Sequence, residues 1–275
     1  MTRARIRSLL LTLLYLGLAV LWLVPVLWMV DTAFKPTAFI FSRPPSWWSP
    51  EWTLSHFREA LQNWPFGRWL WNSLVVATGA TLLTLLLSVP AAYSFSRLQW
   101  RGRNILFFIM VASMLIPWQV NSIPLYFMMN SLDLLNTRIG LILPITAMPI
   151  GVFLLRQFFV NIPRELEEAA QLDGANSFGI LTRVILPMSL PALGALGIYV
   201  FIFTWNEFFW SVIALTRQEM FTIPIGLKAL QGAYDIQYGL LMAAAAFTSL
   251  PVLIIYLFMQ RRIITGITMA STEIK

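Results

Sequence analysis

The chain has no cysteine and a single histidine, His56. The lack of cysteine excludes disulfide bonds and thiolate metal ligands, and one imidazole falls short of the roughly three or four protein ligands of a zinc site. The sequence also lacks the Gly-x-x-x-x-Gly-Lys-Ser/Thr pattern of a nucleotide-binding P-loop. We therefore predict no catalytic residues, no metal and no cofactor, and any ATP that the protein depends on must be hydrolysed by another chain.

Charged residues are scarce in this chain of 275 residues. They make up 11% of it, whereas hydrophobic residues make up 58% and the mean hydropathy is +0.72. A typical soluble domain carries roughly 25% charged residues, so this composition excludes one and indicates an integral membrane protein. Basic cytoplasmic loops explain the net charge of +7, which therefore calls for no nucleic-acid partner.

Six apolar runs are long enough to cross a bilayer, which takes roughly 20 helical residues. We predict an all-α integral membrane protein with a single transmembrane domain over residues 1–275. Prolines inside the third and fourth spans mark kinks; they are Pro117, Pro124, Pro144 and Pro149. The predicted spans lie at residues 8–30, 69–96, 104–130, 139–160, 190–215 and 239–260.

The first span follows a basic segment, as a cleavable signal peptide would. The apolar run is too long for such a peptide and no small-residue cleavage site follows it, so we predict an uncleaved helix. Basic residues then cluster at the span ends that we place inside, which puts both termini in the cytoplasm. Arg156 is expected to reach the inner interface by snorkelling. The inside clusters are Arg3, Arg5 and Arg7; Arg97, Arg101 and Arg103; and Arg261 and Arg262.

Two longer segments are predicted to lie outside. Residues 31–68 are rich in proline and tryptophan, which argues against one long helix and favours an aromatic belt at the membrane interface. Residues 54–63 fit a short helix on the membrane surface. Residues 216–238 show only a loop of modest charge.

One polar stretch interrupts the apolar sequence after the fourth span. Pro163 suits a first helical position, where its missing N–H costs nothing. Glutamates follow in the first turn, where the helix dipole favours anions. Gly174 can then adopt the left-handed conformation that ends a helix. The glutamates are Glu165, Glu167 and Glu168.

A second short helix follows directly. Asn176 or Ser177 can cap its N-terminus, and it is expected to stop near Pro187 and Pro191. An ordinary cytoplasmic loop is the simpler alternative for the whole stretch, and it would need no function.

The residue pattern of this stretch is specific. Glu168-Ala169-Ala170, three residues, Gly174, nine residues, Val184, one residue and Leu186-Pro187 resemble the EAA loop of membrane subunits in binding-protein-dependent ABC importers. That family has isoleucine at the position of Val184. The resemblance implies a cytoplasmic two-helix coupling loop whose first helix docks in a groove of the ATPase.

The resemblance extends over essentially the whole chain. It points to the smaller permease of maltose-type or glycerol-3-phosphate-type importers, in a bacterial cytoplasmic (inner) membrane. It implies a second permease subunit, a dimer of ATP-binding subunits, an extracytoplasmic solute-binding protein and a carbohydrate or related solute. The matching residues are Pro25-x-x-Trp28, Phe34-Lys35, Asn72-Ser73, Ala91-Ala92-Tyr93, Trp205-Asn206-Glu207 and residues 260–268.

The resemblance also assigns roles to particular residues. Glu168 is expected to pair with a basic groove of the ATPase, although a dipole-stabilising glutamate without a partner remains the alternative. Residues 216–238 are expected to reach the binding protein, and residues 266–275 either contact the ATPase dimer or form a disordered end. The aromatic residues are not assigned as sugar ligands. The coupling residues are Glu168, Ala169, Ala170, Asp173, Gly174 and Pro187.

Asn206 and Glu207 interrupt the fifth apolar run. An acid inside a membrane should face protein or a water-filled cavity, so the pair is a candidate for pore or partner contact. The alternative is a glutamate that reaches water near the outer interface. An ion-gradient-driven secondary transporter is the rival function, but such proteins pair ionisable groups at mid-membrane and Glu207 stands nearly alone. An intramembrane enzyme would need a metal or nucleophile constellation that is missing.

Overall fold

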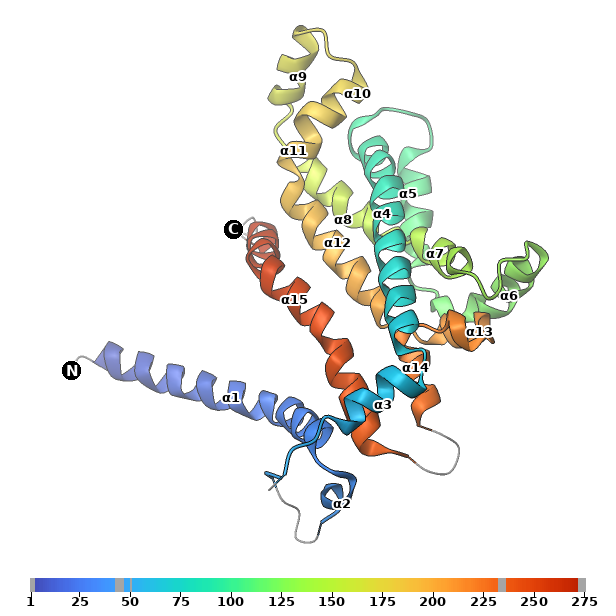
Figure 1. Ribbon diagram of the computed structural model, residues 1–275. Coiled ribbons are helices and arrows are strands. Elements are labelled where there is room, and N and C mark those ends of the chain that lie inside the picture. The colour runs from blue at the N-terminus through green and yellow to red at the C-terminus, as the bar shows by residue number, and fades with distance from the viewer. Residues whose placement is uncertain (1–2, 43–46, 50, 232–235, 272–275) are drawn as a thin grey trace. The chain divides into compact units, whose positions relative to one another are not determined.

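The computed structural model describes residues 3–42, 47–49, 51–231 and 236–271, and these residues contain helices and no strand (Figure 1). They fall into two compact units. The first comprises residues 1–67 and 226–250, and the second comprises residues 68–225 and 251–275. The all-helical class is therefore confirmed, while the single transmembrane domain stays a prediction.

The first unit is built on the long apolar helix α1 (Arg3–Phe34). The described residues of the proline-rich segment after it form two short helices, α2 (Thr37–Ile40) and α3 (Ser55–Asn63). The short helix predicted at residues 54–63 is α3, whereas α2 was not predicted. The ammonium of Lys35 pairs with the carboxylate of Asp31 at 2.5 Å. The backbone carbonyl of Lys35 lies 2.9 Å from Nε2 of His56 on α3. This buried polar group fastens the end of α1 to α3.

The second unit holds most of the remaining helices. The elements in chain order are α4 (Phe66–Arg97), α5 (Arg103–Ser113), η1 (Trp118–Asn121), α6 (Ser122–Ser131), α7 (Arg138–Thr146), α8 (Pro149–Val160), α9 (Glu165–Leu172), α10 (Ser177–Ile180), η2 (Leu181–Ile185), α11 (Leu186–Met188), α12 (Leu190–Trp205), α13 (Phe209–Ala214) and η3 (Gln218–Met220). The last two helices of the described chain are α14 (Ile223–Leu230) and α15 (Tyr238–Ser271).

Among the described residues, two straight helices are long and apolar enough to cross a membrane, at Arg7–Phe34 and Phe66–Arg97. Three bent pairs raise the number to five if each pair is one span. They are Arg103–Ser113 with Trp118–Ser131 at 91°, Arg138–Thr146 with Pro149–Val160 at 44°, and Ser177–Met188 with Leu190–Trp205 at 77°. The apolar helix Tyr238–Ile254 is shorter. The count of six spans therefore stays a prediction.

The expected proline kinks differ in kind. Pro117 marks a complete break, because the chain leaves α5 and restarts as η1 directly after this residue. Pro124 causes no kink, since it lies in the first turn of α6, where the missing N–H has no helical acceptor to lose. Pro149 likewise begins α8, and Pro144 lies inside α7. Position within the helix decides the effect of each proline.

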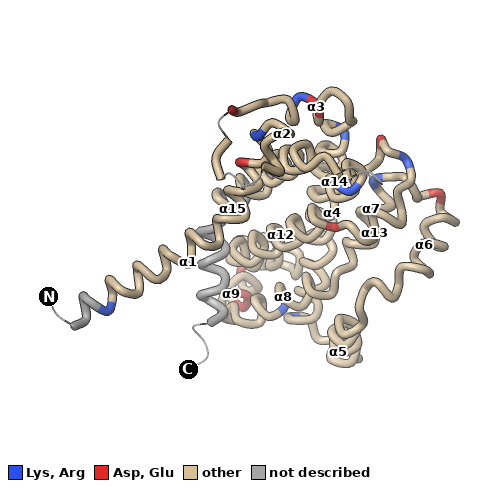
Figure 2. Tube along the Cα trace, turned by 90° about the horizontal axis from the view of Figure 1, so that it is seen from below, with Lys and Arg blue, Asp and Glu red and all other residues tan. Residues whose placement is uncertain are grey.

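The helices of the second unit are almost free of charge along their lengths, and charged residues gather near helix ends and loops (Figure 2). One buried apolar cluster joins the C-terminal part of α4 with α8, η2 and α12. Its buried members are Ala92, Tyr93, Leu155, Phe159, Ile162, Ile180, Leu181, Ile185, Leu196 and Val200. We call this cluster the inner core. Ala170 of α9 packs against it, and Ile180 of α10 is one of its members.

Candidate coupling site

The first helix of the polar stretch is α9, and it begins later than Pro163. Arg164 occupies the N-cap, and its carbonyl accepts hydrogen bonds from the backbone N–H groups of Glu167 (2.9 Å) and Glu168 (3.0 Å). The placement of Pro163 at the first helical position was therefore wrong. The acidic first turn is as predicted, with three glutamates at the positive end of the helix dipole.

The turn after α9 is a complete Schellman motif. The backbone N–H of Gly174 donates to the carbonyl of Gln171, and the N–H of Ala175 donates to the carbonyl of Ala170, each at 2.9 Å. Gly174 has φ +82°, which confirms the predicted left-handed cap. A Cβ at this position would meet no atom within 4 Å. Only the backbone conformation therefore requires glycine here.

The second helical segment follows at once. The side-chain oxygen of Asn176 accepts a hydrogen bond from the N–H of Gly179 at 2.8 Å, so Asn176 is the cap. The segment continues through a π-helical turn and α11, and it breaks at Ser189 between Pro187 and Pro191. The predicted stop near these prolines is confirmed.

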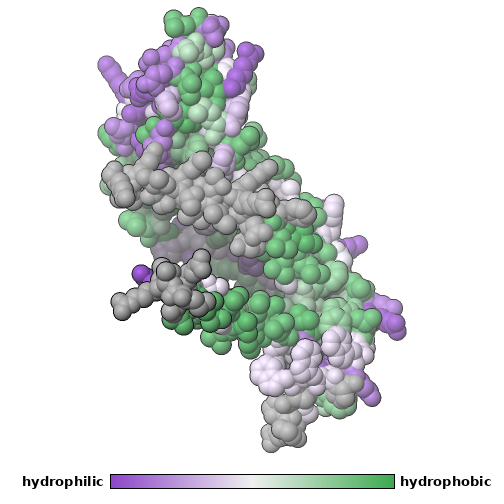
Figure 3. Space-filling model, turned by 90° about the vertical axis from the view of Figure 1, so that its left-hand side faces the viewer, coloured by the Kyte–Doolittle hydropathy of each residue, from purple (hydrophilic) through white to green (hydrophobic). Residues whose placement is uncertain are grey.

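The outer surface of this two-helix elbow (α9 with the segment from α10 to α11) mixes polar and apolar groups. Glu168, Ala169 and Asp173 are exposed. Two large apolar side chains are also exposed, Leu172 at 90% and Phe178 at 73%. The end of the second unit that carries α9 and α10 is largely hydrophilic in Figure 3. Leu172 and Phe178 therefore add apolar surface to an otherwise polar face of the elbow.

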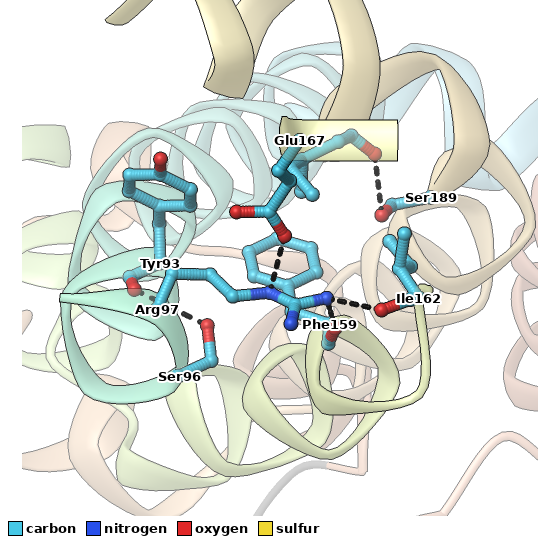
Figure 4. A network of polar contacts seen from close by, with 8 residues as sticks. Tyr93, Ser96, Arg97, Phe159, Ile162, Glu167 and Ser189 are labelled. Atoms are coloured by element: carbon cyan, nitrogen blue, oxygen red, sulfur yellow. Dashed lines mark hydrogen bonds and ion pairs between the residues drawn. The ribbon is translucent and has the colours of Figure 1, made fainter. Parts of the chain in front are cut away.

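The underside of the elbow is anchored by a second glutamate. Glu167 is only 8% exposed and turns inward, where its Oε1 lies 2.8 Å from Nε of Arg97 at the end of α4 (Figure 4). Ala170, one turn further along, packs against the inner core. Neighbouring glutamates of α9 therefore lie in different environments, with Glu167 buried and Glu168 exposed.

Arg97 also binds the end of α8. Its Nη2 donates to the backbone carbonyls of Phe159 (2.5 Å) and Ile162 (2.6 Å) (Figure 4). Since α8 ends at Val160, the carbonyl of Phe159 belongs to the last turn, whose carbonyls lack partners within the helix. The side chain of Arg97 is 5% exposed and that of Glu167 is 11% exposed. One guanidinium therefore joins α4, α8 and α9.

The sequence alone did not reveal this contact. Arg97 served only as a marker of the cytoplasmic side, and Glu167 only as a dipole-stabilising residue. One signal was available, because successive residues of a helix point about 100° apart, so neighbouring glutamates on a helix with one buried face differ in environment.

Arg156 behaves differently from the expected snorkelling residue. Its Nε donates to the carbonyl of Phe95 at 3.2 Å, and its guanidinium carbon lies 4.1 Å from the ring centroid of Phe107. The side chain is therefore held between helices of the second unit.

Asn206 and Glu207 lie between α12 and α13, where the fifth span was expected to continue. Glu207 is buried, and its carboxylate accepts hydrogen bonds from the N–H of Trp210 (2.7 Å) and from the N–H and hydroxyl of Ser211 (3.0 and 2.8 Å). It therefore stabilises the N-terminus of α13. Asn206 is exposed and lines a largely apolar cavity of about 480 Å³ with Trp118, Tyr199, Ile202, Phe203, Glu207, Phe208 and Phe209.

The segment after α13 is more ordered than the expected loop, because it contains η3 and α14. Its first part is bound to the start of α4. The amide nitrogen of Asn72 donates to the carbonyls of Glu219 (2.9 Å) and Phe221 (3.0 Å), and its oxygen accepts from Nε of Arg138 (3.0 Å). The hydroxyl of Ser73 accepts from the N–H of Ile223 at 2.8 Å.

These features describe a capped two-helix elbow held on an apolar helical unit by its buried face. Among the described residues there is no group of three or more histidine, aspartate or glutamate side chains that could hold a metal. The distinctive elements are an apolar helical unit that fits a membrane and a capped two-helix elbow fixed to that unit by its buried face. Together these two elements are the features of the membrane subunit of a transporter.

The chain belongs to the family described as "Binding-protein-dependent transport system inner membrane component", whose model matches residues 84–268. It is 36% identical over 254 residues to the probable ABC transporter permease protein YurM of Bacillus subtilis (strain 168), covering 90% of this chain and 83% of the relative. It is 38% identical over 206 residues to the arabinooligosaccharides transport system permease protein AraQ of the same organism, covering 75% and 73%.

A solved structure gives the same picture. The chain is similar to a subunit of a bacterial ABC transporter involved in the import of the acidic polysaccharide alginate, with a TM-score of 0.82 and 25% identity over 95% of this chain and 98% of the other. The fold is therefore that of an ABC importer membrane subunit, and the resemblance to binding-protein-dependent importers is confirmed.

Proposed function

We propose that this chain forms one half of the translocation pore of an ATP-driven importer for a carbohydrate or a related solute. The observation that carries the proposal is the elbow, because α9 is rigidly capped, its inner face is fixed to the helical unit, and its outer face exposes Glu168, Leu172 and Phe178. The curated relative AraQ, a permease for arabinooligosaccharides, and the alginate importer support a sugar as the solute.

The partners follow from this role. A second permease completes the pore, a dimer of ATP-binding subunits receives α9 of this chain, and an extracytoplasmic protein delivers the solute. The chain itself is not an enzyme, since ATP is hydrolysed on the separate subunits. We place it in the bacterial cytoplasmic membrane with six spans, both termini in the cytoplasm and the segment after α13 outside, where it contacts the binding protein.

The coupling residues are those of the elbow. Glu168 and Asp173 are exposed acids for a basic groove of the ATPase, and exposed ion pairs contribute only about 0–1 kcal/mol each. The apolar contacts of Leu172 and Phe178 therefore supply most of the affinity. Ala169 and Ala170 have small side chains that let neighbouring groups approach α9 closely. Gly174 forms the turn between α9 and α10, and Pro187 lies where the second segment ends.

The test is gentle extraction from the native membrane followed by reconstitution. We expect a second permease and a P-loop ATPase to co-purify, and the co-purified binding protein identifies the solute in a screen of oligosaccharides. Uptake into proteoliposomes should require ATP on the side of the membrane where the ATPase subunits lie. It should persist when ionophores collapse proton and sodium gradients. Uptake that needs an ion gradient and proceeds without ATP would establish the secondary transporter instead.

A further inference from the structure

The ion pair between Arg97 and Glu167 lies at a position that the coupling residues do not explain. It lies on the buried face of α9, its two side chains are almost completely buried, and Arg97 alone joins three helices. We propose that Arg97 and Glu167 are positioning residues that make α9 and the cytoplasmic ends of α4 and α8 one rigid body. This inference rests on the proposed function.

The geometry of Arg97 favours a rigid joint. A guanidinium is planar and offers several N–H groups in a fixed fork, so it can bind a carboxylate and two carbonyls at once in one orientation. Here Nε faces Glu167, while Nη2 binds the carbonyls of Phe159 and Ile162. A movement of α9 against α4 would separate a buried carboxylate from its countercharge, and leaving a buried charge unpaired is strongly unfavourable.

Burial makes the joint stiffer than a surface ion pair. Water around the side chains of Arg97 and Glu167 is largely excluded, so their attraction is weakly screened. The inner core packs beside them through Tyr93 and Phe159, and Ala170 of α9 contacts that core. Polar and apolar contacts therefore hold the same three elements together.

The consequence concerns how force reaches the membrane. When ATP closes the ATPase dimer, α9 is displaced by its partner. With the joint intact, α4 and α8 move together with α9. Because α4 has 32 residues, from Phe66 to Arg97, the movement reaches along its whole length. Without the joint, α9 can turn about residues 161–164, which connect α8 with α9, while α4 stays in place.

The distance between the elbow and the end of α4 tests this directly. The chain has no cysteine, so replacing Leu98 and Gln171 together by cysteine provides its only two thiols for spin labels. Both positions are exposed, and Gln171 lies on α9 outside the proposed docking residues. The labelled chain is assembled with partner subunits whose own cysteines are replaced. Pulsed electron–electron double resonance then gives the distance between the two labels, without nucleotide and with ATP plus vanadate.

We expect the distance to be the same in both states when Arg97 and Glu167 are intact. In Arg97→Gln and in Glu167→Gln the distribution should shift or broaden on nucleotide trapping. The chain that carries both Arg97→Gln and Glu167→Gln should behave like either single Gln variant, because each substitution alone already breaks the same ion pair. Arg97→Lys should give an intermediate change, since an ammonium keeps the charge but cannot hold three acceptors in a fork. Arg101→Gln is the matched control, because Arg101 is exposed and lies in the loop that follows α4.

Each outcome decides the matter. A nucleotide-dependent distance in the intact chain, or an invariant distance in the Gln variants, would overturn the joint while leaving the importer function standing. Failure of the intact chain to bind an ATPase at all would overturn the proposed function and the joint with it. A Gln variant whose distance distribution is already broad without nucleotide supports the joint when the Arg101→Gln control stays narrow, and contradicts it when the control broadens as well.

Discussion

Glu167 and Glu168 are neighbours in the sequence and lie in opposite environments. The carboxylate of Glu167 is buried against Arg97 at 2.8 Å, whereas Glu168 is exposed on the outer face of α9. One turn of α9 therefore holds one buried, paired acid and one exposed acid, and we propose that the exposed one meets the ATPase. The two residues should respond differently to the same substitution.

Neutralising each acid separates the two roles. Glu168→Gln should weaken binding of the ATPase only about two- to fivefold, because an exposed ion pair contributes about 0–1 kcal/mol. Glu167→Gln should lower the stability of the extracted chain, since it leaves Arg97 buried without a countercharge. Thermal unfolding in detergent and ATPase titration measure the two effects. Equal stability of both variants would contradict the assignment.

The exposed apolar residues of the elbow should matter more than its charge. Burying a leucine side chain contributes about 1.5–3 kcal/mol, so Leu172→Asp should weaken ATPase binding about tenfold or more. The substitution should leave the fold intact, because Leu172 is 90% exposed. Binding of the purified ATPase to the chain in nanodiscs measures the effect. An unchanged affinity would show that the partner does not cover this residue.

The left-handed turn at Gly174 should be sensitive to any side chain. A non-glycine residue in this conformation costs about 1–2 kcal/mol, and the space around the position is open. Gly174→Ala should therefore shift the elbow and reduce ATP-driven uptake. Gly102→Ala is the matched control, since Gly102 has φ +84° and open space around it. Equal loss of uptake in both variants would argue for a general strain effect.

Substitutions of Asn206 and of Glu207 should have different effects on stability and uptake. Glu207→Gln replaces one carboxylate oxygen by an amide nitrogen, which cannot accept a hydrogen bond. Either Trp210 or Ser211 then loses its acceptor, so the start of α13 should lose about 1–3 kcal/mol. Asn206→Ala should leave stability almost unchanged, because Asn206 is exposed, and should alter uptake if the cavity lies on the solute path. Thermal unfolding and uptake are measured on both. A stable Glu207→Gln variant would contradict the capping role.

The parts of the elbow that follow local rules could be predicted from the sequence. The left-handed glycine at Gly174, the cap at Asn176 and the stop at Pro187 each depend on a few neighbouring residues. Helix content followed in the same way from the apolar runs. The start of α9 was misplaced by two residues, because proline tolerates the position before a helix as well as the first position within it.

The contacts between distant segments could not be predicted. Arg97 meets Glu167, and Asn72 meets Arg138, only after the helices pack. The 91° break after α5 also depends on packing, since proline in a membrane helix allows a kink, a break or a normal start. Tertiary structure chooses among these, and one sequence gives no measure of that choice.

A single thiol on the elbow tests the central claim most directly. Leu172→Cys gives the chain its only cysteine, at an exposed position of α9, and a short photoactivatable crosslinker is attached to it in native membranes. We predict an adduct with a P-loop ATPase, identified by mass spectrometry. Leu115→Cys, exposed on an apolar part of the second unit, should yield no such adduct. Absence of any ATPase adduct from position 172, with efficient capture of other proteins or lipid there, would contradict the account.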